Sequence, residues 1–385
     1  MTAAIDGRAS ALVQQAIDEA ISSGREIGVQ VCAYRDGKKV VDVWGGLADP
    51  ETGRQVDGDT LFNVFSVTKA VVATAIHMQV ERGLLEYDAP ITRYWPEYAA
   101  NGKARTTVRD ALSHRACIPQ MPEGVTPEQM CDWSLMTKRI AELEALAEPG
   151  SKTLYLSMTF GWILGELVVR SDPQHRDFGR WVHEEIAEPL GIADLWLGIP
   201  DVVEGRIAYL TDAGPVVPAQ YLPPLFSASM PPQVALVPQV FSRPDVRRAC
   251  VAGVGGVFNA RSEARFFAML AQGGELDGVR LLSEERVRSF SVPRANSDEP
   301  DPVMFNIPLP LSSGGYWLGG DYPPVCSVKN PRAICHPGAG GSIGWADPDA
   351  RLAVAICHNR MFNASSREED SILPIAEALR AGLGL

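Results

Sequence analysis

The chain has 385 residues, of which 46% are hydrophobic, and its net charge at pH 7 is −12. The acidic balance argues against nucleic acid as a partner and leaves no polybasic patch for a membrane surface. The composition is that of a globular protein with a large core. Its length suits one two-lobed enzyme as well as two or three domains.

Seven cysteines are scattered singly along the chain, and none has the C-x-x-C spacing of a zinc or redox site. This pattern predicts reduced thiols, so we expect a cytoplasmic protein. No stretch reaches the roughly 18 apolar residues of a membrane span, and the N-terminus has no basic segment followed by an apolar one. We therefore expect no membrane span, and the sequence implies no metal or cofactor.

The first elements in chain order are a helix and a hairpin. Apolar residues recur at helical spacing across 10–22. Residues 28–34 and 40–46 are β-branched and apolar, and the Asp-Gly pair between them is typical of a hairpin turn. A loop then leads into the run 67–80, which is apolar nearly all round and predicts a buried helix.

The middle of the chain is predicted to be mainly helical, with proline-rich breaks. Helices are expected at 107–112, 133–148, 160–169 and 178–188. The segment 199–246 differs, because it is rich in proline, aromatic and aliphatic residues and has little periodicity. Such a long segment within a folded chain is typical of a lid or binding loop, so we expect it to shape a pocket. The alternative is an irregular surface excursion.

The last third of the chain returns to strands. After a helix at 262–272, strands are expected at 315–319, 333–336, 342–346 and 352–357, and a final helix at 371–381. Strands at both ends predict an α+β fold. Its antiparallel sheet is built from N- and C-terminal strands and flanked by helices, with a mainly helical region inserted. We assign 1–60 and 250–385 to the sheet region and 61–249 to the helical region.

One short pattern is chemically distinctive: Ser66-x-x-Lys69 at the start of the apolar helical run. Residues three apart share a helix face, so the hydroxyl and the amine can meet. Unpaired N–H groups at the helix start would lie beside Ser66. A serine that attacks a carbonyl needs a proton acceptor and donors for the developing oxyanion. From the pattern alone, a catalytic pair and a buried, salt-bridged lysine both stay open.

Three motifs then occur in a known order: Ser66-x-x-Lys69, Tyr155-Leu156-Ser157 and His336-Pro337-Gly338. With them the chain resembles the serine β-lactamase and penicillin-binding protein superfamily, specifically the class C β-lactamase-like branch with its esterases. The fold expected from this resemblance is β-lactamase/transpeptidase-like. Further matching stretches are Gly83-Leu84-Leu85, Leu112-Ser113-His114, Pro189-Leu190-Gly191 and Gly338-Ala339-Gly340-Gly341.

The resemblance implies a role for each motif. Ser66 would be the acylated nucleophile, and Lys69 would hold or accept its proton. Tyr155 would be a phenolate-like general base, its pKa lowered by a neighbouring cation. The oxyanion would be bound by the backbone N–H groups of Ser66 and Ala339. Substrate would also meet His336, Gly338 and Ser157.

Two departures from the family pattern bear on the substrate. Position 157 is Ser where the second motif usually ends in Asn, which offers both a donor and an acceptor. The third motif begins His336-Pro337 where β-lactamases usually have Lys-Thr. Both changes point away from strong β-lactam recognition and toward the carboxylesterase branch sometimes called family VIII. The remaining histidines, including His114, are expected to serve packing or local caps.

We therefore expect a serine hydrolase that cleaves small carboxylic esters through an acyl-enzyme on Ser66, with a small-molecule ester as its partner. Several alternatives use the same site or fold. They are an acyltransferase, a weak β-lactamase or D-amino peptidase, and a catalytically silent binding member. The sequence leaves open the acyl chain length and the oligomeric state, a homo-oligomer included.

Overall fold

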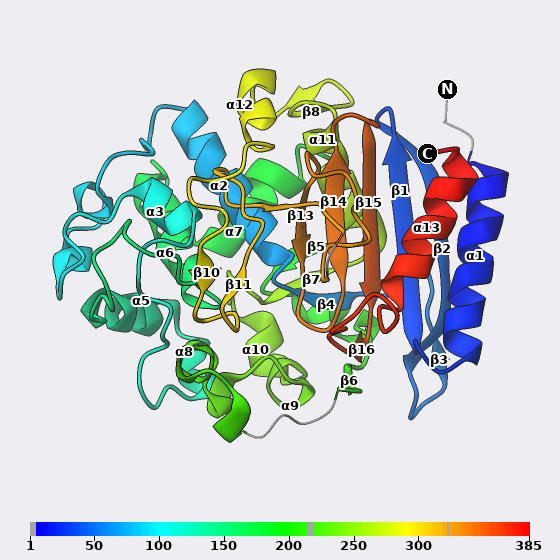
Figure 1. The fold of residues 1–385 in the computed structure, drawn as a ribbon, viewed down its shortest axis with the longest axis horizontal. Coiled ribbons are helices and arrows are strands. Elements are labelled where there is room, and N and C mark those ends of the chain that lie inside the picture. Colours follow the sequence, from blue (N-terminus) through cyan, green and yellow to red (C-terminus); the bar gives the residue numbers. More distant parts are fainter. Residues whose placement is uncertain (1–4, 215–218, 322) are drawn as a thin grey trace.

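A seven-stranded antiparallel sheet, in the order β12-β13-β14-β15-β1-β2-β3, dominates one side of the molecule (Figure 1). The computed structural model describes residues 5–214, 219–321 and 323–385. The strands of this sheet are β1 (Gly28–Arg35), β2 (Lys38–Asp49), β3 (Arg54–Gln55), β12 (Trp317–Leu318), β13 (Ile334–Pro337), β14 (Ile343–Asp347) and β15 (Leu352–His358). Strands from the two ends of the chain thus form one sheet, as predicted, because β1 pairs with both β2 and β15.

The two faces of the sheet carry alternate residues of β1, as the two-residue period of a strand requires. Val29, Val31 and Ala33 face α1 (Gly7–Ser22) and α13 (Ile372–Leu383), which pack against each other at the right of Figure 1. Cys32 and Tyr34 belong to the opposite face, which α11 (Ala260–Ala271) covers. Both faces are therefore buried, which explains why β1 is almost continuously apolar.

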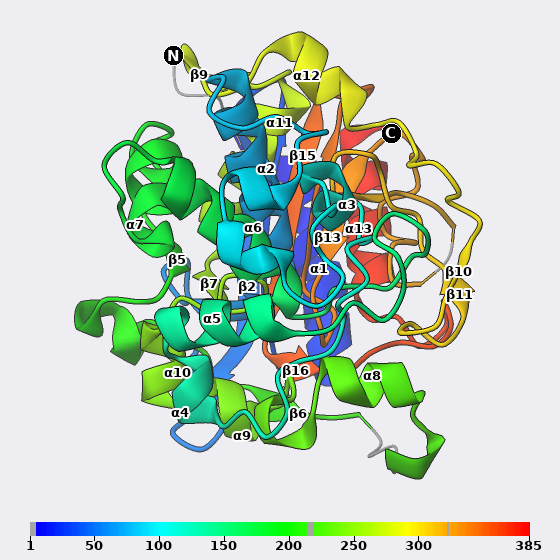
Figure 2. The same ribbon diagram turned by 90° about the vertical axis from the view of Figure 1, so that its left-hand side faces the viewer.

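The helical region packs beside the sheet, and Figure 2 looks onto it, with α2 and α6 in front of the large sheet. Its helices are α2 (Thr68–Glu81), α3 (Val108–Leu112), α4 (Pro127–Met130), α5 (Trp133–Glu142), α6 (Thr159–Ser171), α7 (Phe178–Val182), α8 (Pro224–Ser229), α9 (Pro238–Phe241) and α10 (Pro244–Arg248). A further helix, α12 (Glu284–Ser289), follows α11. Among the described residues, none of the helices is long and apolar enough to cross a bilayer.

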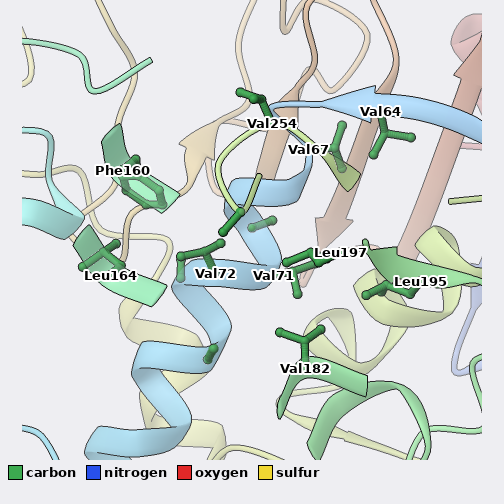
Figure 3. Close-up of a cluster of buried hydrophobic side chains, with 14 of the residues drawn as sticks. Val64, Val67, Val71, Val72, Phe160, Leu164, Val182, Leu195, Leu197 and Val254 are labelled. Atoms are coloured by element: carbon green, nitrogen blue, oxygen red, sulfur yellow. The ribbon is translucent and has the colours of Figure 1, made fainter. Parts of the chain in front are cut away.

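A small sheet, β4-β7-β5, supports the start of α2. It consists of β4 (Phe62–Phe65), β5 (Leu195–Leu197) and β7 (Gly256–Phe258). Figure 3 shows Val71 and Val72 of α2 beside Phe160 and Leu164 of α6, with the leucines of β5 close by. The residues of α2 from Thr68 to Gln79 are all buried, which confirms the helix predicted from the apolar run. The remaining short strands are β6 (Thr211–Asp212), β8 (Glu275–Leu276), β9 (Val279–Arg280), β10 (Pro300–Asp301), β11 (Ile307–Pro308) and β16 (Arg360–Met361).

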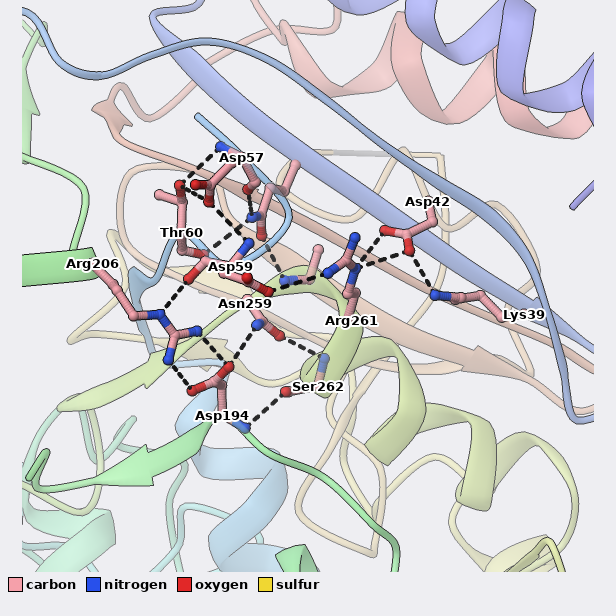
Figure 4. A network of polar contacts seen from close by, with 12 residues as sticks. Lys39, Asp42, Asp57, Asp59, Thr60, Asp194, Arg206, Asn259, Arg261 and Ser262 are labelled. Atoms are coloured by element: carbon pink, nitrogen blue, oxygen red, sulfur yellow. Dashed lines mark hydrogen bonds and ion pairs between the residues drawn. The ribbon is translucent and has the colours of Figure 1, made fainter. Parts of the chain in front are cut away.

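A network of polar contacts holds the connection between β7 and α11 in place (Figure 4). The network thereby also positions the small sheet. Asn259 caps α11 by accepting a hydrogen bond from the Ser262 N–H, and its amide donates to Asp194 at 3.0 Å. Arg206 donates two hydrogen bonds to the same Asp194 carboxylate. Arg261, in the first turn of α11, pairs with Asp42 of β2. The network therefore links the helical region to the large sheet.

Some predicted helices end earlier than expected. The helix expected at 133–148 stops at Glu142, because the N–H groups of Ala145 and Leu146 bond to distant carbonyl groups instead. The helix expected at 178–188 is α7 followed by a π-helical turn, His183–Ala187. In the described part of 199–246, the short helices α8, α9 and α10 each begin with proline, a residue that suits the first helical position.

Candidate active site

Ser66 lies in the tight turn between β4 and α2. It precedes the helix, which begins at Thr68. The preceding residue, Phe65, has a φ of +46°, a left-handed conformation that is costly for a bulky side chain. Thr68 stabilises this turn, since its hydroxyl donates to the Phe65 carbonyl and accepts from the Gly256 N–H of β7 at 2.9 Å. The turn therefore holds Ser66 in one strained, well-anchored position.

Lys69 is fully buried, and its amine has three partners. Its Nζ lies 2.9 Å from Ser66 Oγ, 2.7 Å from the Ser157 carbonyl oxygen and 2.9 Å from the Gly253 carbonyl oxygen. Burial without a carboxylate partner lowers its pKa to about 7. In the neutral amine, two N–H groups go to the two carbonyls and the lone pair is left facing Ser66. The geometry therefore suits proton transfer from the serine hydroxyl.

Tyr155 lies on an irregular segment before α6, and its ring packs against aromatic neighbours. It stacks on the His114 ring at 4.3 Å and meets Trp317 edge-on at 6.0 Å, while Lys69 Nζ lies 5.6 Å from its ring centroid. Burial, and then the negative charge of Asp301, raises the pKa of Tyr155, although Trp317 and Ser66 act in the other direction. This direction is opposite to the one expected for a phenolate. Burial favours the protonated hydroxyl and outweighs the hydrogen bonds from Trp317 and Ser66 that lower this pKa.

The loop after β13 comes very close to the Ser66 turn. A Cβ on Gly338 would stand 2.3 Å from the carbonyl oxygen of Val64 in β4, so only glycine permits this approach. Gly338 is the third residue of the His336-Pro337-Gly338 motif. The third motif therefore packs against the backbone of β4, the strand that leads into Ser66.

Three N–H groups of this loop have identifiable partners. Gly338 donates to the Ser342 carbonyl, Gly340 to Asn363 Oδ1 and Gly341 to the Gly338 carbonyl. Within the described ranges, the N–H groups of Ala339 and Ser66 have no protein acceptor. These two free donors are the pair expected from the sequence to bind an oxyanion.

His336 lies at the end of β13 and is completely buried. Its Nδ1 lies 2.9 Å from the Pro337 carbonyl oxygen, and its Nε2 has no partner in the described part of the chain. Burial, and then the proximity of Lys69, keeps the pKa of His336 well below its ordinary value. The imidazole is therefore neutral and offers no positive charge to a substrate carboxylate.

Ser157 contacts the site through its backbone and the proline-rich segment through its side chain. Its carbonyl accepts from Lys69, and its Oγ lies 3.1 Å from Ser229 Oγ at the end of α8. Ser229 donates its single proton to the Phe226 carbonyl, so the Ser157 hydroxyl must donate to Ser229. The side chain of Ser157 is therefore tied to α8, and its proton is already engaged.

Sequence reasoning missed the two residues that hold the backbone around Tyr155. The Leu154 N–H donates to the His114 carbonyl and the Leu156 N–H to His114 Nδ1, both at 3.0 Å. The Tyr155 N–H donates to Asp301 Oδ2 at 2.9 Å. His114 does serve packing, as expected, and the side chain that it packs against is that of Tyr155. Asp301 lies 146 residues away and carries no signal in the sequence.

No metal-binding arrangement occurs among the described residues, since no three His, Cys, Asp or Glu side chains are grouped to hold an ion. All seven cysteines are free thiols.

Comparisons with known proteins agree with this geometry. The sequence model of the Beta-lactamase family matches residues 13–378. The esterase/beta-lactamase LipL of Mycobacterium tuberculosis is 35% identical over 357 residues, which cover 88% of this chain and 79% of LipL. The crystal structure of a family VIII carboxylesterase superposes with a TM-score of 0.88 at 29% identity, over 99% of both chains. A penicillin-binding protein homologue from Caulobacter crescentus gives 0.85 at 30% identity, again over 99% of both chains. The resemblance and the fold expected from the sequence are both confirmed.

Proposed function

This chain belongs to the Beta-lactamase family, and from that premise we propose that it is a serine carboxylesterase that works through an acyl-enzyme on Ser66. The single observation that carries the proposal is the contact of Lys69 Nζ with Ser66 Oγ at 2.9 Å, in a site where burial lowers the pKa of the amine to about 7. A base with a pKa near the working pH is well suited to remove a serine proton.

Acylation begins when Lys69 takes the hydroxyl proton of Ser66 and Oγ attacks the ester carbonyl carbon. The carbonyl oxygen becomes an oxyanion, which accepts hydrogen bonds from the N–H groups of Ser66 and Ala339. The carbon–oxygen bond to the alcohol then breaks. Tyr155, protonated in its buried position, gives its phenolic proton to the departing alkoxide and recovers a proton from the Lys69 ammonium. The products are free alcohol, an acyl ester on Ser66 and neutral Lys69.

Deacylation repeats these steps with water in place of serine. Lys69, neutral again after acylation, removes a proton from water, and the resulting hydroxide attacks the acyl carbon. The same two N–H groups bind the second oxyanion. Ser66 leaves as an alkoxide and regains its proton, so the carboxylic acid is released and the enzyme is restored.

Simple esters fit the site better than β-lactams. The neutral, buried His336 lacks the charge that would bind a β-lactam carboxylate, and the Ser157 proton is engaged by Ser229. The relative LipL is named an esterase and a beta-lactamase, so a weak β-lactamase activity is the second candidate.

We further propose that the protein works in the cytoplasm on a small-molecule ester and does not bind nucleic acid. Its seven free thiols and its net charge of −12 support this setting. We also propose the division into a sheet region, 1–60 with 250–385, and a helical region, 61–249. The composition of the large sheet from both ends of the chain supports that division.

The test is turnover of p-nitrophenyl acetate and butyrate, with intact-protein mass, for the wild type and Ser66→Ala. A matched control is Ser134→Ala, a substitution on the distant helix α5. We expect turnover that is lost only in Ser66→Ala. A stable acyl adduct that accumulates on Ser66 would instead favour acyl transfer to another acceptor. Ser66-independent turnover, or no adduct and no turnover, would overturn the proposal, and nitrocefin hydrolysis would then test the second candidate.

A further inference from the structure

We propose that Asp301 is a positioning residue for the reaction, which holds the backbone of Tyr155 at the distance from Ser66 that proton transfer needs. The inference rests on the proposed ester hydrolysis. It adds a residue outside the three motifs, on the excursion between α12 and the large sheet.

The argument starts from the weak local support of Tyr155. The residue belongs to neither a helix nor a strand, so its position depends on contacts with other parts of the chain. Three consecutive N–H groups, from Leu154 to Leu156, are each bonded, the outer two to His114 and the central one to Asp301 Oδ2. The hydrogen bond to Asp301 is thus the only one in the described structure that holds the N–H of Tyr155 itself.

Asp301 is itself rigidly held. It is completely buried, and its Oδ1 accepts from the N–H groups of Val303 at 2.9 Å and Met304 at 3.3 Å. Its carboxylate therefore joins the Tyr155 segment to the turn after β10. A hydrogen bond to an ionised acceptor in a buried site is stronger than one between neutral groups. The arrangement is a clamp on the backbone rather than a surface ion pair.

A second acidic residue repeats the contact two residues earlier in both segments. Glu299 Oε2 accepts from the Thr153 hydroxyl at 2.9 Å, while Asp301 accepts from the Tyr155 N–H. The same Glu299 oxygen pairs with Arg115 at 2.5 Å. The segments 299–301 and 153–155 therefore lie side by side in register, which fixes Tyr155 along the chain direction as well as across it.

The charged and titratable groups around Asp301 define how the clamp responds to pH. The charged side chains nearby are Arg294, Glu299 and Arg115. On the side toward Ser66, the titratable groups are the Tyr155 hydroxyl and His114. Burial raises the pKa of Asp301 to about 6, against three backbone N–H donors and Arg294 that lower it. The Asp301 carboxylate is thus charged above about pH 6. Below that pH it is protonated, and it accepts hydrogen bonds from the backbone N–H groups less strongly.

The test compares Asp301→Asn with Asp298→Asn, which removes the same charge from an exposed position on the same excursion. Asparagine keeps the shape, but its amide nitrogen cannot accept an N–H, so one of the three bonds is lost. We expect Asp301→Asn to lower kcat for p-nitrophenyl acetate by about tenfold to a hundredfold with KM changed less than about threefold. Asp298→Asn should match the wild type in both constants.

The pH profile separates positioning from general destabilisation. In the wild type, kcat/KM should fall in two steps on acidification, near pH 7 for Lys69 and near pH 6 for Asp301. Asp301→Asn should keep the upper step and lose the lower one. A variant that retains the lower step, or the full kcat, would overturn the inference.

Amide hydrogen exchange keeps the inference testable even if Asp301→Asn does not fold or the ester activity fails. In the wild-type protein, protection of the Tyr155 amide should fall as the pH drops through 6, after correction for intrinsic exchange. Protection of the Leu154 amide, bonded to the His114 carbonyl, should not change. Equal behaviour of the two amides would overturn the clamp, whereas a loss of Ser66-dependent turnover alone would overturn only the proposed function.

Discussion

The α-carbon of Gly338 faces the carbonyl oxygen of Val64 with no room for a side chain between them. This contact joins the loop that carries the Ala339 N–H to the strand that leads into Ser66. The two free N–H donors are thus held together by backbone packing, and no side chain needs to adjust when an oxyanion forms. Preorganised donors of this kind usually contribute strongly to catalysis.

Gly338→Ala should therefore impair catalysis. The new Cβ would lie 2.3 Å from the Val64 oxygen, so the loop must shift and carry the Ala339 N–H away from its position. We expect kcat for p-nitrophenyl acetate to fall by about a hundredfold, the scale for the loss of one oxyanion donor. Gly205→Ala is the control, because a Cβ there meets no atom within 4 Å. Equal kcat values for the two variants would contradict the role given to this loop.

Lys69 should set the acid limb of the pH–rate profile. Because burial lowers its pKa to about 7, the amine is protonated below that pH and cannot accept the serine proton. Above the lower step assigned to Asp301, we expect kcat/KM to rise tenfold per pH unit from about pH 6 to about pH 7 and then to level off. Lys69→Met should lose this limb and about 10² to 10⁴ of the rate, the usual contribution of a general base. A profile that rises only above pH 9 would show that the amine keeps its ordinary pKa.

Glu263 should make stability depend on pH far from the active site. It is buried on α11 beneath the large sheet, where its Oε2 accepts from Cys357 Sγ and its Oε1 has no partner in the described structure. Burial raises its pKa from 4.5 to about 8. The folded state therefore holds a proton that the unfolded chain releases, so the contribution of Glu263 to the free energy of unfolding should be highest below pH 4.5. It should fall as the pH rises toward 8, by a few kcal/mol in total.

Denaturant unfolding of the wild type and Glu263→Gln between pH 5 and 9 measures this effect. The glutamine has no charge to lose, so its pH slope should be smaller across that range. Glu285→Gln, an exposed substitution, should retain the wild-type slope. Parallel curves for all three proteins would rule out a buried, protonated Glu263.

Much of this architecture could be predicted from the sequence, and the exceptions have physical causes. Ser66 and Lys69 were paired correctly because three-residue spacing is a local property. The sheet was predicted because alternating and continuous apolar runs mark its strands at both ends of the chain. The early end of α5 was not predicted, because the N–H groups of Ala145 and Leu146 bond to carbonyl groups far away in sequence. The pKa of Tyr155 depends on burial, and the contact of Tyr155 with Asp301 spans 146 residues of sequence. Neither can therefore be predicted from a local sequence pattern.

The place of β15 in the sheet has a consequence for how the protein is made. This strand lies between β14 and β1, so the first strand of the chain stays without one neighbour until residues 352–358 have been synthesised. Long-range pairing of this kind is slow and leaves a strand edge open in the meantime. A ribosome-bound chain that already contains Ser66, Lys69 and Tyr155 would therefore still be inactive. Full activity should appear only after β15 has left the ribosome, and truncation before residue 352 should yield an aggregating chain.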